Sequence, residues 1–123
     1  FMKFFNYLVD QGINITLTAS KVVPNKYKSL LDMFEKTLAH EQIVTRRINE
    51  LTEQAVQEKD HATQIFLQWF VTEQIEEENN DRDIIAKLKL VGGNGHGVLM
   101  IDNELAQRVF VAPAGGAAPF PVA

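Results

Sequence analysis

The chain has 123 residues, about one domain, and its 46% hydrophobic and 23% charged content is typical of soluble globular proteins. It has no apolar run of about 18 residues and no signal-like leader, so we expect no membrane partner and a cytoplasmic location. The absence of cysteine excludes disulfides and thiolate metal ligands, and the net charge of −4 argues against nucleic acid as a partner.

The first residues are predicted to be the end of a helix, followed by an extended linker. Apolar side chains at positions 1, 4, 5 and 8 have helical spacing, and no capping residue precedes them, so they resemble the last turns of a longer helix. Gly12 should end this helix. The alternation of Ile13, Ile15 and Leu17 then favours extended backbone over residues 13–28.

Two long helices and one short helix are predicted after the linker. Ser29 is a predicted N-cap, with Asp32 reaching back to the amide of the cap residue, and this helix should run to about Glu58. Asp60 should cap the next helix, which should end at Gly92 and Gly93. A connection this short makes the two helices antiparallel neighbours. A short helix is expected over 98–109.

The predicted organisation is therefore an all-α domain over residues 1–110 with a tail at 111–123. The tail contains Ala, Pro and Gly and no charge. We expect it to be disordered or to dock as an extended strand.

Each long helix carries a glutamate at the centre of its apolar stripe, Glu41 in the first and Glu77 in the second. Residues seven apart on a helix are only about 20° out of line, so the flanking apolar residues place both carboxylates among hydrocarbon. Burying them would cost several kcal/mol each unless a cation or proton neutralised them. The spacing therefore favours a bound metal. The flanking residues at steps of seven are Phe34 and Ile48 in the first helix and Phe70 and Ile84 in the second.

The run from Glu73 to Glu78 supplies further oxygen atoms. Glu73 and Glu77 are one turn apart on the predicted inner face, and Gln74 is three residues from Glu77, so an amide and carboxylates flank one site. Charge runs on helices usually face solvent, and we expect this of Glu76 and Glu78. A carboxylate cluster inside a helical bundle binds hard or borderline cations such as iron, manganese or magnesium.

The alternative is a buried acid pair held by an arginine, but Arg46, Arg47 and Arg82 lie off the predicted stripes. The three histidines are interpreted as surface residues, because each lies off the stripes or in a turn. They are His40, His61 and His96.

Five segments carry a resemblance to the bacterial non-haem ferritins. The stretch 66–78, FLQWFVTEQIEEE, resembles the fourth long helix of that family. The segments 2–7, 40–42, 87–92 and 101–105 match in order and spacing, so the resemblance covers residues 1 to about 106. It implies a ferritin-like four-helix bundle. Of that bundle this chain would hold the third and fourth long helices, a short C-terminal helix and the end of the second helix.

The resemblance also implies a function and a site. Glu41 and Glu77 would be ligands of a di-iron ferroxidase centre with Gln74 beside it, and Glu73 and Glu76 would help form a third iron site. Iron(II) would be oxidised by dioxygen or peroxide and stored as iron(III) mineral in a homo-oligomeric octahedral cage. No haem is expected, because bacterioferritins carry Glu-x-x-His where this chain has Gln74-x-x-Glu77.

One departure from the family pattern leaves a second function open. The first helix and most of the second, which carry the remaining ligands, are absent from these residues. The expected alternative is a non-catalytic structural or iron-binding subunit with an incomplete centre. The ferroxidase function would need the missing N-terminal half as a partner.

Overall fold

The computed structural model describes residues 1–20, 22 and 26–108. Within these ranges all regular structure is α-helical, which confirms the predicted fold class. The predicted tail at 111–123 lies outside the described residues. No described helix is long and apolar enough to cross a membrane. The helices are α1 (Met2–Asp10), α2 (Leu30–Gln57), α3 (His61–Val91) and α4 (Gly95–Ala106).

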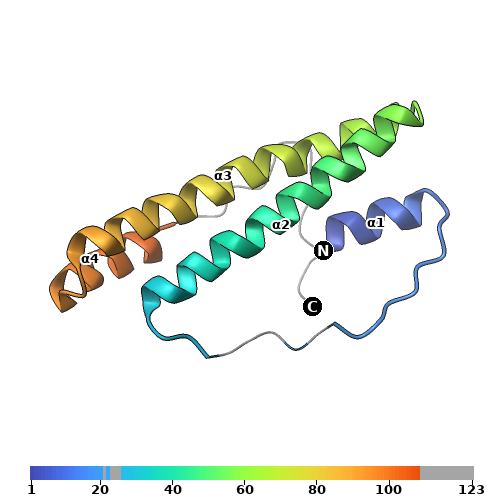
Figure 1. The fold of residues 1–123 in the computed structure, drawn as a ribbon. Helices are drawn as coiled ribbons and strands as arrows, with labels where there is room; N and C mark the ends of the chain where they lie inside the picture. Colours follow the sequence, from blue (N-terminus) through green and yellow to red (C-terminus); the bar gives the residue numbers. More distant parts are fainter. Residues whose placement is uncertain (21, 23–25, 109–123) are drawn as a thin grey trace.

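The two long helices, α2 and α3, form an antiparallel hairpin (Figure 1). Ser29 caps α2 as predicted, with its Oγ accepting from the amide of Asp32 at 3.0 Å. The predicted return contact to the Ser29 amide is wrong, because Asp32 Oδ2 instead accepts from the amide of Lys28 at 3.0 Å. The extended backbone of Ser29 (φ −161°, ψ 170°) brings that earlier amide over the first turn of the helix.

Asp60 caps α3, as predicted, and links the hairpin turn to α1. Its carboxylate accepts from the amide of Thr63 at 3.0 Å and from the Thr63 hydroxyl at 2.6 Å. The Thr63 hydroxyl has one proton, which it donates to Asp60. The Tyr7 hydroxyl, 2.8 Å from Thr63 Oγ1, therefore donates to Thr63. This chain of hydrogen bonds fixes α1 against the start of α3.

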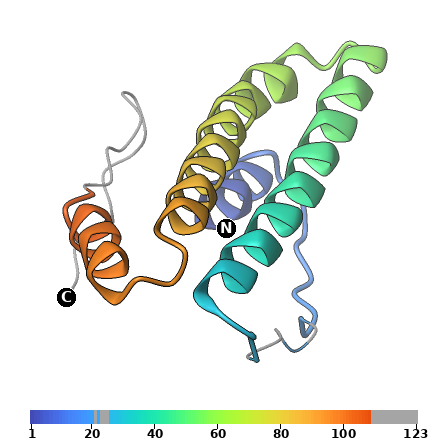
Figure 2. The same ribbon diagram turned by 60° about the vertical axis from the view of Figure 1, so that its left-hand side comes forward.

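An aromatic cluster holds α1 against the first half of α3. The ribbon of α1 lies alongside the α2–α3 hairpin (Figure 2). The rings of Tyr7 and Phe66 stack with centroids 3.9 Å apart, and Phe4 contacts both Phe66 and Phe70. The ammonium of Lys3 lies 3.8 Å from the centroid of the Trp69 ring, a cation–π contact. The aromatic residues of α3 therefore serve packing.

The C-terminal end of α3 follows the prediction, whereas α4 does not. Gly92 (φ 55°) and Gly93 (φ 82°) adopt the left-handed conformation that ends α3. The short helix was expected at 98–109 but spans 95–106, because Asn94 caps it by accepting from the amide of His96 at 3.0 Å. A β-carbon on Gly97 would lie 2.6 Å from the side chain of Val91, so glycine there lets α4 pack on α3. A small core of Ile84, Leu88 and Ile101 joins the two helices.

Candidate metal centre

The face that α3 turns toward α2 contains two polar residues among apolar ones. Leu67, Gln74, Asp81 and Leu88 follow one another at steps of seven, and all four are buried. Leu67 is 2% exposed, Gln74 8% and Asp81 7%. An amide and a carboxylate therefore occupy the middle of a helix interface, where each needs a compensating partner.

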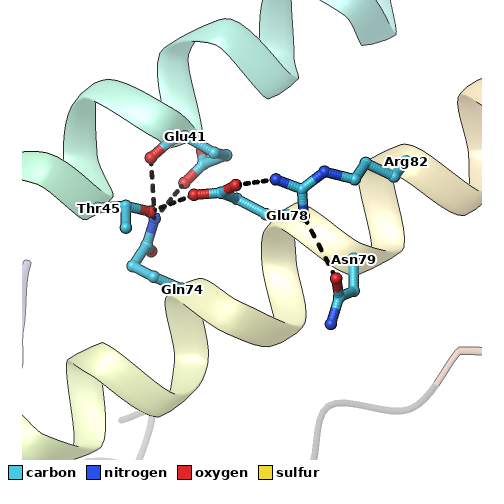
Figure 3. Close-up of polar contacts among 6 residues, drawn as sticks. All are labelled: Glu41, Thr45, Gln74, Glu78, Asn79 and Arg82. Atoms are coloured by element: carbon cyan, nitrogen blue, oxygen red, sulfur yellow. Dashed lines mark hydrogen bonds and ion pairs between the residues drawn. The ribbon is translucent and has the colours of Figure 1, made fainter.

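Gln74 obtains its partners from α2 (Figure 3). Its Nε2 donates to the Glu41 carbonyl at 3.2 Å, to Glu41 Oε2 at 3.1 Å and to Thr45 Oγ1 at 3.2 Å. The reverse amide orientation would place Oε1 against the two oxygens of Glu41, so repulsion disfavours it. Gln74 thus ties the carboxylate of Glu41 to α3, and the structure brings these two predicted site residues together.

Glu78 continues this network, contrary to the expectation that it faces solvent (Figure 3). The Thr45 hydroxyl donates to Glu78 Oε1 at 2.7 Å, and Arg82 forms an ion pair with Glu78 Oε2. The Glu78 side chain is only 12% exposed. The prediction was wrong because these two partners satisfy the carboxylate at the helix interface. Arg82 also donates to Asn79 Oδ1 at 3.3 Å.

Glu77 lies on the edge of this interface, and the expectation that it is buried is wrong. It is three residues from Gln74 and four from Asp81, which places it about 40 to 60° away from the axis of the buried face. Its side chain is exposed, whereas Glu41 and Glu73 are half-buried. Glu76 is exposed, as predicted.

Negative charges nonetheless gather around Glu77. Partial desolvation, followed by repulsion from Glu41, Asp81, Glu73 and Glu76 in that order, raises the pKa of the Glu77 carboxyl above its usual 4.5. Because Glu77 is exposed, water screens part of this repulsion. A cation beside these carboxylates would relieve the repulsion.

Asp81 is the site residue that the stripe-based prediction missed. Burial is the largest cause that raises its pKa above the usual 3.8, repulsion from Glu41 adds to it, and the charge of Arg108 opposes it. Its Oδ2 is fully buried and accepts no hydrogen bond from the described residues. The steps of seven from Leu67 through Gln74 to Leu88 are the sequence signal that identifies this position.

No basic side chain among the described residues forms an ion pair with Glu77 or Asp81. The one basic neighbour of Glu41 among them is His40, whose Nδ1 lies 3.7 Å from Glu41 Oε1. Arg82, a candidate for holding the acid pair, is committed to Glu78. All three histidines are exposed, as expected of surface residues. The described residues contain no group of three acidic, histidine or cysteine side chains already converged for a metal.

The donor set between α2 and α3 suits a hard cation. All the candidate ligand atoms are carboxylate or amide oxygens, which hard and borderline divalent cations prefer. The buried Asp81 Oδ2 lacks a donor among the described residues, and Glu41 and Glu77 have no lysine or arginine at ion-pair distance there. The chemistry of this region therefore fits a metal ion, although the side chains would have to move closer together to surround it.

Comparisons with known proteins agree with the fold. A model of the ferritin family, the ferritin-like domain, matches residues 1–91. The bacterial non-heme ferritin of Campylobacter jejuni is 44% identical over 103 residues, which are 84% of this chain and 62% of that protein. The bacterial non-heme ferritin of Staphylococcus aureus (strain USA300) is 37% identical over 108 residues, 88% of this chain and 65% of that protein.

A solved structure gives the same result. The open pore ferritin from the hyperthermophilic archaeon Archaeoglobus fulgidus superposes with a TM-score of 0.85 at 44% identity, covering 88% of this chain and 67% of that one. The chain spans 62% and 65% of the lengths of the two bacterial relatives. Its helical hairpin, its sequence and the family match lead to one assignment: the chain belongs to the ferritin family.

Proposed function

We propose that the protein binds iron(II) at the carboxylates between α2 and α3, oxidises it and stores the product as iron(III) mineral. Glu41 and Glu77 would hold the metal at a di-iron ferroxidase centre with Gln74 beside it, and Glu73 and Glu76 would form an adjacent third site. The oxidant would be dioxygen or peroxide. The observation that carries this proposal is a group of mutually repelling carboxylates around Glu77, one of which, Glu41, Gln74 holds in place.

The residues would act by positioning and by charge. Each iron(II) gives up one electron to the oxidant, so positive charge at the site increases, and anionic ligands stabilise the product more than the reactant. Gln74 keeps the Glu41 carboxylate at the helix interface through its amide nitrogen. The raised pKa of Glu77 means that iron binding displaces a proton from that carboxyl over part of the acidic range.

Assembly and location belong to the same proposal. The relatives are ferritins, and we infer that this protein likewise forms a homo-oligomeric, octahedral cage that encloses the mineral in the cytoplasm. The first helix and most of the second, to which the family resemblance assigns the remaining ligands, would complete the centre.

A second function has one observation in its favour. The described residues contain no converged group of three ligands, which suits a subunit that binds iron without oxidising it. Such a subunit would serve as a structural or iron-binding component of the cage. Measurements of binding and of oxidation on the same sample separate the two functions.

The test compares iron(II) oxidation by the full-length protein and two variants in a stopped-flow absorbance assay. Glu77→Gln removes the charge and one ligand oxygen, and it should slow oxidation by about tenfold or more. Even the loss of a residue that only hydrogen-bonds to a metal ligand lowers metal affinity or activity by about 10- to 100-fold. Glu50→Gln, an exposed position on α2 remote from the cluster, is the matched control and should oxidise iron at the parent rate.

Two results would contradict the proposal. The ligand assignment fails if Glu77→Gln oxidises iron as fast as the parent. If the parent binds iron(II) but oxidises it no faster than buffer, the non-catalytic subunit is the correct function.

A further inference from the structure

Asp81 is a buried carboxyl group with an oxygen that no described residue satisfies by a hydrogen bond. It is 7% exposed, and its Oδ2 accepts no hydrogen bond from the described residues. A buried carboxylate without partners destabilises a protein by several kcal/mol or takes up a proton. An apolar side chain would fill this interface position as Leu67 and Leu88 do on the same face. A bound cation at this position would compensate the charge of Asp81.

The neighbours of Asp81 indicate what that ligand is. Asp81 lies seven residues from Gln74 on the same face, and four residues, or about 6 Å along the helix axis, from Glu77. Glu41, which Gln74 holds from the other helix, and Asp81 repel each other strongly enough to raise the pKa of Asp81. Glu41, Glu77 and Asp81 therefore influence one another electrostatically along one stretch of the α2–α3 interface, although they have not converged on one point. One cation bound between them would reduce the repulsion among all three.

We propose that Asp81 is a ligand for a hard divalent cation, iron(II) or manganese(II), which it binds through Oδ2 together with Glu41 and Glu77. This inference rests on the proposed function and adds to it a residue outside the ligand set that the family resemblance implies. Without the cation, like charges hold the three carboxylates apart, so no converged site forms among the described residues. The cation draws the side chains together by rotation about their own bonds.

Arg108 is the one competing partner. Its positive charge lowers the pKa of Asp81, but this effect is smaller than those of burial and of Glu41. The two side chains form no ion pair within 4.0 Å. Arg108 therefore does not satisfy the buried oxygen.

The test measures manganese(II) binding to the full-length protein without oxygen, following free manganese(II) by electron paramagnetic resonance. Manganese(II) is a stable probe for a hard divalent site, so the readout does not depend on iron oxidation. Five variants are compared with the parent, and one of them, Arg108→Gln, removes the positive charge that opposes the raised pKa of Asp81. Asp81→Asn keeps the shape but removes the charge, Asp81→Glu keeps the charge, Glu77→Gln tests the proposed centre, and Asp102→Asn, at an exposed position on α4, is the control.

Asp81→Asn should weaken manganese(II) binding by about tenfold or more or remove one bound ion per chain. Asp81→Glu should retain more of the binding than Asp81→Asn, and Asp102→Asn should bind as the parent does. A thermal melt of each variant guards against misfolding. Asp81→Asn should melt at or above the parent temperature without metal, because a buried charge has been removed, and should show a smaller rise when manganese(II) is added.

The results separate this inference from the proposed function. If Glu77→Gln weakens binding while Asp81→Asn does not, the proposed centre stands and the role of Asp81 is refuted. Both ideas are refuted if the parent binds no manganese(II). If Asp81→Asn lowers the metal-free melting temperature as much as Arg108→Gln does, and the manganese-induced rise is unchanged, Asp81 is a structural partner of Arg108 and not a ligand.

Discussion

Replacing Gln74 with leucine tests whether this amide holds Glu41 in place. Leucine has a similar size, so the change removes the hydrogen bonds without opening a large cavity. The Nε2 group has two protons, and its three contacts with Glu41 and Thr45 therefore count as about two hydrogen bonds. One of them goes to a carboxylate and is worth about 1.5 to 3 kcal/mol, while the neutral one is worth about 0.5 to 1.5 kcal/mol.

The gain from leucine offsets part of this loss. Burying the added hydrocarbon at a position that is 8% exposed returns about 1 to 2 kcal/mol. Gln74→Leu should therefore lower the free energy of unfolding by about 1 to 2 kcal/mol. Gln68→Leu, at an exposed position on the same helix, is the control and should change it by less than about 0.5 kcal/mol.

Urea denaturation of Gln74→Leu, Thr45→Val and the double variant measures the coupling between the two side chains. Thr45 accepts from Gln74 and donates to Glu78, so we expect a coupling energy of about 0.5 to 1 kcal/mol. A double variant whose loss equals the sum of the single losses would refute the network. So would a Gln74→Leu protein as stable as the parent that binds manganese(II) equally well.

Two further predictions concern stability. Leu67→Ala should lower the free energy of unfolding by about 2 to 5 kcal/mol, because Leu67 is the most deeply buried large side chain described. Ile65→Ala, at an exposed position, is the control and should lower it by less than about 0.5 kcal/mol. Urea titrations measure both changes. The metal-free protein should lose stability as the pH rises above the usual carboxyl pKa values of 3.8 for Asp81 and 4.5 for Glu77, because folding raises both pKa values and the folded state then binds more protons than the unfolded state. Asp81→Asn should flatten this slope, and an unchanged slope would show that Asp81 does not titrate as described.

Local signals predicted much of the fold. The caps Ser29 and Asp60 and the terminating Gly92 act through hydrogen bonds or backbone angles within a few residues, so the sequence alone identifies them. The start of α4 escaped prediction because a glycine-rich stretch normally indicates a turn. Here Gly97 is needed for close packing against Val91, a tertiary contact that local propensity does not record.

The inner face of α3 was harder to predict than the helix itself. Two sets of residues have helical spacing, one through Phe66 and Phe70 and one through Leu67, Gln74 and Asp81. The first set packs against α1 and the second against α2, so periodicity alone could not decide which face is buried in the hairpin. Gln74 and Glu41 do lie together as predicted, whereas Glu77 lies at the edge of the interface.

Anomalous diffraction at the iron absorption edge, from crystals of the full-length protein soaked with iron(II) without oxygen, tests the central claim most directly. The account predicts an iron peak within bonding distance of the carboxylates of Glu41 and Glu77, with Asp81 Oδ2 turned toward the same region. Iron peaks that lie only elsewhere, with Glu41 still held by Gln74 and Glu77 facing solvent, would contradict it.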